Sequence, residues 1–328
     1  MSANTGLRVD YADPAERDAL LADPQVLALF GFRAGARPSL DTDPRWLEVG
    51  LQPYGQAQLE VWRSQHPAQH GRDRDLAWAQ SADLGFGVLQ VDEAEHGGIE
   101  AAACYAYQRL GEHLANSAHP RLLRIWNYMD AITLGEGDEE RYRQFCVGRA
   151  AGIGKIDTQQ LPAATAIGRC DGVRVFQLYW LCCNQPGTPL ENPRQVSAYH
   201  YPRQYGRQAP SFARAMLGPN NVQLPLLLSG TASVVGHETR HAGQALAQIG
   251  ETLTNLQVLI DTAREQRPQL SAQLGAGSRL KVYVTRAEEQ AEVEAALSKQ
   301  LDPAIPRMIL HGTICRHDLM MEIDGVHQ

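Results

Sequence analysis

The sequence lacks the features that would carry this chain into or across a membrane. Its N-terminus reads MSANTGLRVDYADPAERD, without a basic region followed by an apolar stretch, so no secretory signal peptide is predicted. No segment approaches the roughly 18 consecutive apolar residues that a membrane-spanning helix needs. We therefore expect a cytoplasmic protein with no membrane partner.

Signatures of metal binding and of nucleic-acid binding are also scarce. The six cysteines are scattered without the short spacings of zinc sites, and we interpret them as free thiols of a cytosolic chain. The net charge of -7 argues against a nucleic-acid-binding surface. It does not exclude a small anionic substrate, because such a ligand responds to nearby arginines rather than to the total charge.

Two stretches of the chain repeat one order of predicted elements. Residues 110–116 read LGEHLAN and residues 249–255 read IGETLTN, and each copy is followed by a strand-like, a helix-like and a second strand-like segment. The sequence therefore predicts two tandem α/β units, over residues 81–184 and 224–328, with helices packed on one face of mixed β-sheets. Residues 1–80 show weak periodicity and are expected to form an N-terminal extension on the core.

A long connector, residues 185–223, joins the two predicted units. It contains NPRQVSAYHYPRQYGRQAPSFARA, which is rich in proline, tyrosine and arginine. Loops of this length are usually functional or disordered, and the aromatic residues favour an ordered loop. Arginine side chains bind carboxylates through paired hydrogen bonds, so the connector is a candidate active-site segment.

One motif of the second unit matches a zinc-hydrolase pattern. His237 to His241 read HETRH, and on a helix this spacing places two histidines on one face for zinc, with Glu238 as the base. Here the motif straddles a predicted strand–helix junction after Gly236, and only Glu251 is a conceivable third ligand. The sequence favours the alternative that these are polar residues at the start of a helix.

The C-terminal segment MILHGTICRHDLMMEIDGV predicts a β-hairpin with its turn at His317 and Asp318, because its side chains alternate on both arms. A lone carboxylate beside methionine and cysteine side chains is a candidate for a raised pKa and hence for a general acid. The alternative is that this face is exposed to solvent. The predicted face consists of Thr313, Cys315, Met320 and Glu322.

The first unit provides a control for this assignment. Aligning the two units sets Glu322 opposite Gln177 or Leu178, and Arg307 opposite Ala163. The first unit therefore has neither the acid nor the arginine. The fold does not require them, so we interpret both as candidates for chemistry.

One arginine of the first unit stands on an apolar stripe. Tyr142, Phe145 and Arg149 recur at helical spacing within residues 138–151. An unpaired guanidinium in that position is costly, so a carboxylate of the protein or of a ligand should neutralise it.

Together these motifs resemble those of the chorismatases, which cleave chorismate to pyruvate and either a dihydroxycyclohexadiene carboxylate or a hydroxybenzoate. The resemblance covers residues 81–328 and rests on RIWNYMDAIT followed by RYRQFCVGRA, on the connector, and on CRHDLMMEIDG. It implies two units of the RidA (YjgF-like) α/β fold, and neither a metal nor another cofactor. The sequence is most similar to bacterial members that form 3- and 4-hydroxybenzoate for xanthomonadin-type pigment and ubiquinone biosynthesis.

The resemblance also implies roles for individual residues. Glu322 would protonate the enolpyruvyl methylene of chorismate, and Cys315 would mark the hydroxybenzoate-forming members. Ala232 stands where hydroxybenzoate formers can carry glycine, and Arg307 resembles the carboxylate-binding arginine of RidA. The implied substrate-binding residues are Tyr142, Arg149, Tyr201, Arg214, Arg307 and Ala232.

We therefore expect an enzyme that converts chorismate to 3-hydroxybenzoate, with 4-hydroxybenzoate as a second product, and pyruvate. The alternatives are hydrolysis of chorismate to the dihydroxycyclohexadiene carboxylate, a zinc hydrolase, and a non-catalytic RidA-like binding protein. Single-copy RidA proteins are trimers, and a tandem chain satisfies such interfaces internally. The resemblance thus predicts a monomer with one active site.

Overall fold

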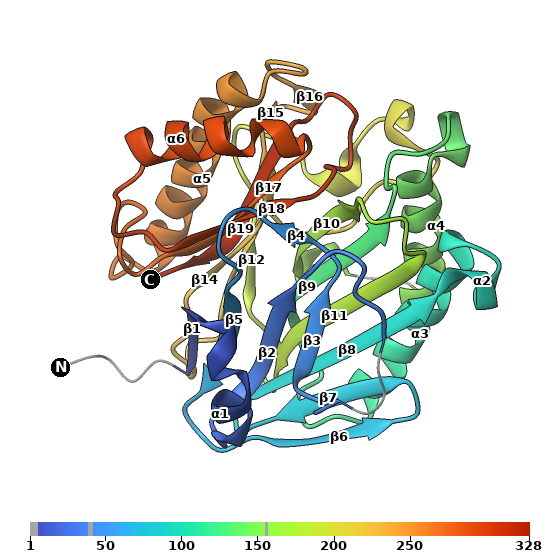
Figure 1. Cartoon of the computed structure of the whole chain (residues 1–328), viewed down its shortest axis with the longest axis vertical. Helices are drawn as coiled ribbons and strands as arrows, with labels where there is room; N and C mark the ends of the chain where they lie inside the picture. Colours follow the sequence, from blue (N-terminus) through green and yellow to red (C-terminus); the bar gives the residue numbers. More distant parts are fainter. Residues whose placement is uncertain (1–5, 39–41, 155–156) are drawn as a thin grey trace.

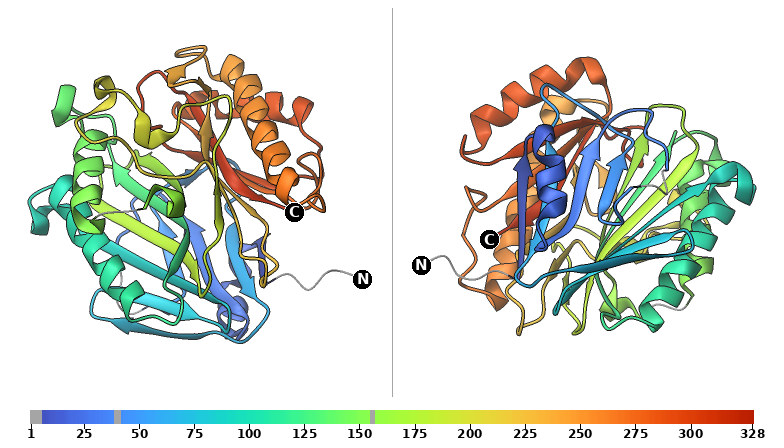
Figure 2. Two further views of the ribbon diagram at one scale, coloured as in Figure 1. Left: turned by 180° about the vertical axis from the view of Figure 1, so that it is seen from behind. Right: turned by 60° about the horizontal axis from the view of Figure 1, so that its bottom comes forward.

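Three β-sheets surround a common interior in the computed structural model, which describes residues 6–38, 42–154 and 157–328 (Figure 1). Helices lie on the outer faces of the sheets, which Figure 2 shows from two further sides. The α/β class, with helices packed on mixed sheets, is confirmed.

We name the three sheets after the parts of the chain that form them. The N-terminal sheet has the strand order β1 (Leu7–Ala12), β5 (Leu59–Ser64), β2 (Val26–Phe32) and β3 (Trp46–Val49). The first-unit sheet has the order β10 (Ala163–Arg169), β9 (Arg121–Asp130), β11 (Val175–Cys183), β8 (Leu84–Asp92), β7 (Leu76–Gln80) and β6 (Gln69–Asp73). The second-unit sheet has the order β12 (Thr188–Leu190), β13 (Ala215–Leu217), β14 (Leu226–Ala232), β19 (Met321–His327), β17 (Arg279–Val284), β18 (Arg307–His311) and β4 (Gln52–Pro53). A separate ladder pairs β15 (Val234–Val235) with β16 (Glu238–Thr239).

Each sheet buries the apolar stripe of its own helices, because residues three and four apart in a helix lie on one face. In the residues that the structure describes, every helix is too short or too polar to span a membrane. The helices are α1 (Arg17–Ala22) on the N-terminal sheet, α2 (Glu93–His96), α3 (Ile99–Ala115) and α4 (Arg141–Ile153) with the first-unit sheet, and α5 (Ala245–Gln266) and α6 (Gln290–Gln300) on the second-unit sheet.

The opposite faces of the three sheets meet in a shared interior. Side chains alternate along a strand, so one set packs on the helices and the other set fills the interior. Strands β2 and β11 are buried at every position, as expected for strands that are covered on both faces. The shared interior therefore joins the N-terminal sheet to both units in one core.

The three sheets share one topology. In each, a central strand (β2, β9 or β17) pairs with a parallel strand on one side and an antiparallel strand on the other. The N-terminal sheet repeats this pattern with a short first helix, and the described residues between β2 and β3 form no helix. Residues 7–64 thus contain a third, reduced version of the unit, which the weak periodicity of this segment did not reveal.

The strand register places three side chains at equivalent positions in the three sheets. Each belongs to the last strand of its unit and lies opposite an aromatic residue of the central strand. We call these the equivalent positions, and they are occupied by Glu60, Gln177 and Glu322. Their aromatic partners are Phe30, Tyr128 and Tyr283, which pair in turn with Leu47, Ile167 and Leu310 of the parallel strands.

The predicted C-terminal hairpin is wrong. Strands β18 and β19 are not neighbours, because β17 lies between them in the second-unit sheet. Residues 312–320 instead form a loop that reaches the first unit. The backbone N–H of Gly168 in β10 donates to the Thr313 carbonyl (2.7 Å), and the Thr313 N–H donates to the Gly168 carbonyl (2.9 Å). We call residues 312–320 the bridging loop.

The structure changes the interpretation of two further sequence observations. The LGEHLAN match at residues 110–116 closes α3, whereas its counterpart at residues 249–255 lies near the start of α5. The repeated topology is real, but this short match does not mark equivalent places in it. The first-unit sheet also begins before residue 81, at β6, while the division of the chain into domains stays a prediction.

Candidate active site

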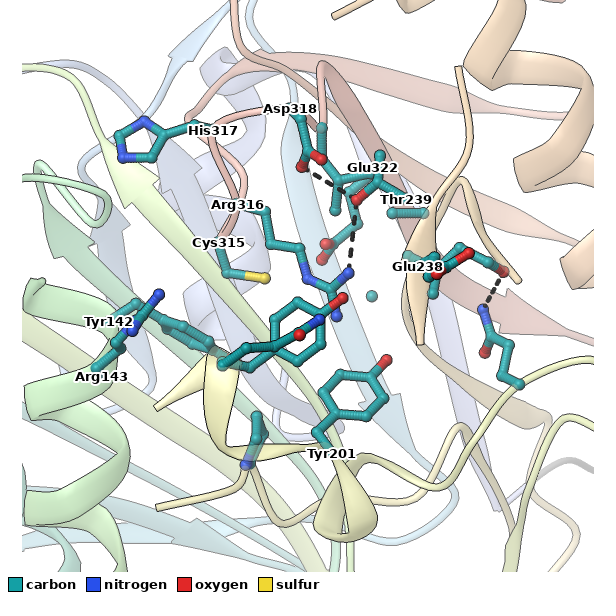
Figure 3. A pocket seen from close by; sticks show the side chains of 18 of the residues that line it. Tyr142, Arg143, Tyr201, Glu238, Thr239, Cys315, Arg316, His317, Asp318 and Glu322 are labelled. Carbon is teal, nitrogen blue, oxygen red and sulfur yellow. Dashed lines mark hydrogen bonds between the residues drawn. The ribbon is translucent and has the colours of Figure 1, made fainter. Parts of the chain in front are cut away.

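A cavity of about 550 Å³ lies between the second-unit sheet, the bridging loop, the start of α4 and the connector (Figure 3). Both units and the connector therefore contribute to its walls. The cavity brings together most of the residues that the sequence singled out, namely Tyr142, Tyr201, Arg214, Ala232, Cys315 and Glu322.

Glu322 lies on β19, opposite Ala232 of β14, and is only 5% exposed. This burial excludes the alternative that its face is open to solvent. Gly230 makes room for the carboxyl, because a Cβ atom at that position would stand 1.9 Å from Glu322 Oε1. The carboxyl therefore occupies space that any side chain at position 230 would fill.

The surroundings of Glu322 favour its neutral form. Burial, above all, and the neighbouring charge of Asp324 raise its pKa to about 8, although Arg124 and Arg214 act in the opposite direction. At neutral pH the carboxyl is therefore protonated and able to donate a proton into the cavity.

Cys315 and Tyr142 are neutral neighbours of this acid. Burial raises the pKa of the Cys315 thiol to about 12, with a smaller contribution from Glu322. Burial likewise raises the pKa of Tyr142 well above its ordinary value. Cys315 stands on the bridging loop and Tyr142 in the first turn of α4, so the two reach the cavity from different units (Figure 3).

Two arginines that line the cavity have no carboxylate of the described chain within ion-pair distance. Arg214 Nη2 donates to the Tyr201 hydroxyl (2.7 Å) and to the Val196 carbonyl (3.1 Å), while its buried Nε has no partner in the described chain. Arg316 Nη1 donates to the His237 carbonyl (2.9 Å), and its guanidinium lies 4.1 Å from the ring centre of Tyr205. Both cations are thus held in place without being neutralised.

The HETRH motif helps to hold Arg316. Glu238 and Thr239 form β16, and His241 has φ +53°, so the two histidines do not share a helical face. The motif also precedes α5, which corrects the expectation of a helix start. Across the described ranges, no three His, Cys, Asp or Glu side chains are grouped as a metal site would require. The carbonyl of His237 accepts hydrogen bonds from Arg316 and from the Tyr205 hydroxyl.

The structure does not bring Arg307 to the cavity. Its guanidinium forms paired hydrogen bonds with Glu294 of α6 and a further one with Ser298. The register of β18 directs this residue toward α6, because the neighbouring β-strand positions face the interior. Arg307 therefore does not line this cavity, and its predicted contact with substrate stays a prediction.

Arg149 follows Tyr142 by seven residues in α4 and does not line the cavity. It is 5% exposed, and its guanidinium lies 5.3 Å from the ring centre of Tyr107. Its Nε and Nη2 have no hydrogen-bond partner among the described residues. That an anion neutralises Arg149 therefore stays a prediction. The two nitrogens without hydrogen-bond partners support it.

The sequence did not predict two contributors to the site. Arg316 stands directly after Cys315 in the CRHD segment, and this proximity was its only signal. Gly230 carried a weaker one, as a glycine within an otherwise apolar strand, which can mark a close approach.

The chain is similar to known proteins over most of its length. A family model described as "Chorismatase FkbO/Hyg5-like, N-terminal" matches residues 60–182. A 3-hydroxybenzoate synthase of Streptomyces hygroscopicus is 34% identical over 300 residues, covering 88% of this chain and 87% of its own. A chorismatase of the same organism is 35% identical over 277 residues, covering 83% and 79%. A chorismatase crystal structure is similar over 99% of both chains, with a TM-score of 0.88 and 32% sequence identity. This chain belongs to the chorismatase family.

Proposed function

We propose that this chain converts chorismate to 3-hydroxybenzoate and pyruvate, with 4-hydroxybenzoate as a second product. The observation that carries the proposal is a buried carboxyl, Glu322, on the wall of a cavity with two arginines that lack a carboxylate partner in the described chain. Family membership supports the choice of substrate, because curated relatives include a 3-hydroxybenzoate synthase and chorismatases.

The charges of the cavity suit a dicarboxylate such as chorismate. Arg214 and Arg316 lack carboxylate partners in the described chain, and arginine binds carboxylates through two parallel hydrogen bonds. Tyr201 and Tyr142 supply hydroxyl groups and ring faces on the cavity wall. We assign one substrate carboxylate to each arginine, and keep Arg149 as a further cation behind Tyr142.

The acid acts on the enolpyruvyl group. Glu322 donates its proton to the methylene carbon, which leaves an oxocarbenium-like carbon on the ether. The bond between the ring carbon and the ether oxygen then breaks, its electrons remain on that oxygen, and pyruvate departs. General acid catalysis of this kind contributes on the order of 10²–10⁴-fold to the rate.

Formation of hydroxybenzoate needs no water. The neighbouring ring hydroxyl displaces the departing oxygen to form an epoxide, and its proton returns to the Glu322 carboxylate. Isomerisation of the epoxide then yields the aromatic ring. Cys315 supports this route by placing a neutral thiol, rather than a charged group, on the cavity wall.

Hydrolysis is the second candidate, and Ala232 is the observation that favours it. In that route a water molecule replaces the departing oxygen, which gives the dihydroxycyclohexadiene carboxylate. Ala232 lines the cavity opposite Glu322, where its methyl group alters the space beside the ring.

Incubation with chorismate tests the proposal. Pyruvate is measured enzymatically, and the ring products are separated by chromatography against the two hydroxybenzoates and the dihydroxycyclohexadiene carboxylate. Equimolar pyruvate and hydroxybenzoate are expected. Exclusive formation of the non-aromatic acid selects the hydrolytic route, and an absence of pyruvate rejects both in favour of a binding protein.

We also propose that the enzyme works as a monomer. The interior that the three sheets share is closed within one chain, and the cavity takes residues from both units of that chain. Light scattering during size-exclusion chromatography is expected to give the mass of a single 36.1 kDa chain. A trimeric mass at working concentration would contradict this expectation.

A further inference from the structure

A buried polar network ends two residues from the proposed acid. Asp324 follows Glu322 on β19, so the two side chains leave the same face of the strand. Asp324 is fully buried, and one of its oxygens, Oδ2, accepts hydrogen bonds from side chains of both units. The donors are Arg124 Nη2 (3.2 Å), Trp126 Nε1 (2.9 Å), Thr165 Oγ1 (2.8 Å) and the Tyr283 hydroxyl (3.0 Å).

This arrangement suits an ionised carboxylate, because Arg124 and Lys281 both lie within 4 Å of Asp324. Four donors converge on one oxygen, and only an ionised carboxylate offers nothing but acceptors. The second oxygen, Oδ1, has no hydrogen-bond partner in the described chain but lies 3.9 Å from Lys281 Nζ. A fixed negative charge therefore stands inside the core, where it is screened far less than at the surface.

The network reaches the cavity through Thr165 of β10. The Thr165 hydroxyl accepts from Arg124 and donates to Asp324. It lies 3.3 Å from the point where a Cβ atom of Gly230 would stand, and Glu322 Oε1 lies 1.9 Å from the same point. The charged network and the proposed acid are thus immediate neighbours across the seam between the two units.

We propose that Asp324 is a positioning residue for the proton of Glu322, and that its charge keeps Glu322 protonated before each turnover. This inference rests on the proposed function of Glu322 as the acid. After Glu322 has given up its proton, two carboxylates lie buried on the same face of β19. Their repulsion drives Glu322 to take back the proton that the substrate hydroxyl releases, so Asp324 also resets the acid.

The other groups around Glu322 fit this assignment. Arg124 and Arg214 are the cations that act on it, and both oppose Asp324 in setting its pKa. Cys315 and Tyr142, which face it from the bridging loop and α4, are neutral at physiological pH because burial raises both pKa values. Asp324 is therefore the one negative neighbour that raises this pKa among the residues that the structure describes.

Two substitutions with opposite consequences test the proposal. The kcat/KM for pyruvate release is measured against pH, because its high-pH limb reports loss of the acidic proton from free enzyme. Asp324→Asn removes the negative charge, so the limb should move to lower pH by about one unit or more. Arg124→Gln removes the opposing cation, so the limb should move to higher pH. A purely structural role predicts lost activity in both variants without opposite displacements.

A double variant covers the case in which Asp324→Asn leaves Arg124 buried without a partner and prevents folding. Asp324→Asn/Arg124→Gln removes both charges together, and neutral replacement of a buried ion pair is often tolerated. Its limb should lie below that of Arg124→Gln alone. Asp171→Asn provides the control, because it changes an aspartate whose side chain is 4% exposed and which pairs with Arg169 in the first unit. That control should leave the limb in place.

A readout without turnover separates this inference from the proposed function. Infrared difference spectra with pH follow the protonated carboxyl band of Glu322, which is identified by its absence in Glu322→Gln. If Asp324→Asn lowers the pH at which this band disappears, the inference holds even where activity proves independent of Glu322. An unchanged or raised titration point in that variant overturns it, whatever the enzyme's products are.

Discussion

The equivalent positions in the second-unit and N-terminal sheets both carry a glutamate, but only Glu322 lines the cavity of about 550 Å³. Glu322 lines the cavity, with no cation of the described chain within ion-pair distance. Glu60 is 3% exposed and lies 2.8 Å from Lys281 Nζ, while Trp62 Nε1 donates to its other oxygen (2.7 Å). One topological position thus holds the proposed proton donor in one sheet and half of an ion pair in the other.

The first-unit sheet gives a third outcome at the same position. Gln177 Nε2 donates to the Glu48 carbonyl (2.9 Å), and its amide oxygen accepts from the Gly50 N–H (3.0 Å). The guanidinium of Arg169 fills the adjoining space, since a Cβ atom at Gly50 would stand 2.1 Å from it. The fold therefore supplies an equivalent position in each sheet. The neighbouring residues determine whether the side chain there is available for reaction, forms an ion pair or makes only hydrogen bonds in the core.

The largest expected effect comes from giving the second unit the residue of the first. Glu322→Gln keeps the shape of the side chain but removes the transferable proton. Pyruvate release from chorismate should fall on the order of 10²–10⁴-fold, while thermal unfolding changes little. Glu238→Gln is the control, because it alters an exposed carboxylate of the same cavity and should retain activity near that of the parent. Equal activity of the two variants would remove Glu322 from the mechanism.

At Glu60 we expect a loss of stability with little change in activity. Glu60→Gln leaves Lys281 buried without its nearest partner, which should lower the free energy of unfolding by about 3–5 kcal/mol. The turnover of the folded protein should stay close to that of the parent. Urea denaturation followed by circular dichroism measures the first quantity. The double variant Glu60→Gln/Lys281→Met should recover stability, and a further loss there would contradict an ion-pair origin.

A substitution at Gly230 tests how tightly the second-unit sheet packs against the Glu322 carboxyl. Gly230→Ala places a methyl group against Glu322 Oε1, so the carboxyl must move. Activity should fall by about 10- to 100-fold, because small misplacements of reacting groups are expensive. Gly111→Ala is the matched control, since nothing lies within 4 Å of a Cβ atom there and alanine favours the helix. Similar kinetics for both variants would show that the site tolerates the added methyl group.

The smallest expected change concerns product rather than rate. Cys315→Ala keeps the acid as well as Arg214 and Arg316, so pyruvate release should stay within the same order of magnitude. The ring products should shift from hydroxybenzoate toward the dihydroxycyclohexadiene carboxylate, because the smaller side chain leaves room for water beside the ring. Chromatography of the products gives the ratio, and an unchanged ratio would refute the role of Cys315.

Local patterns in the sequence predicted the elements well. Helical spacing within residues 138–151 placed α4 (Arg141–Ile153) close to its observed bounds, because this helix buries one face. The hairpin failed because alternation shows which side chains share a face but not which strand lies next to which. Strand β17 comes between the two arms, and only the three-dimensional order of the sheet reveals it.

The site was predicted where chemistry depends on residue type and missed where it depends on packing. Glu322 stood out as a carboxylate among apolar residues, and the family resemblance implied Arg214; both line the cavity. Arg307 looked similar in sequence, but Glu294 of α6 already neutralises it. Gly230 acts through the space that it leaves empty, which a sequence does not display.

The bridging loop links the contact between the two units to the arrangement of residues in the cavity. Thr313 ties this loop to Gly168 in β10, whereas Glu322 belongs to β19 of the second unit. The spacing between thiol and acid is therefore set by how the two halves of the molecule lie against each other, and neither half determines it alone. Such a spacing can change without loss of either fold. Under the proposed function, mutations far from the cavity should therefore be able to shift the ratio of aromatic to hydrated products.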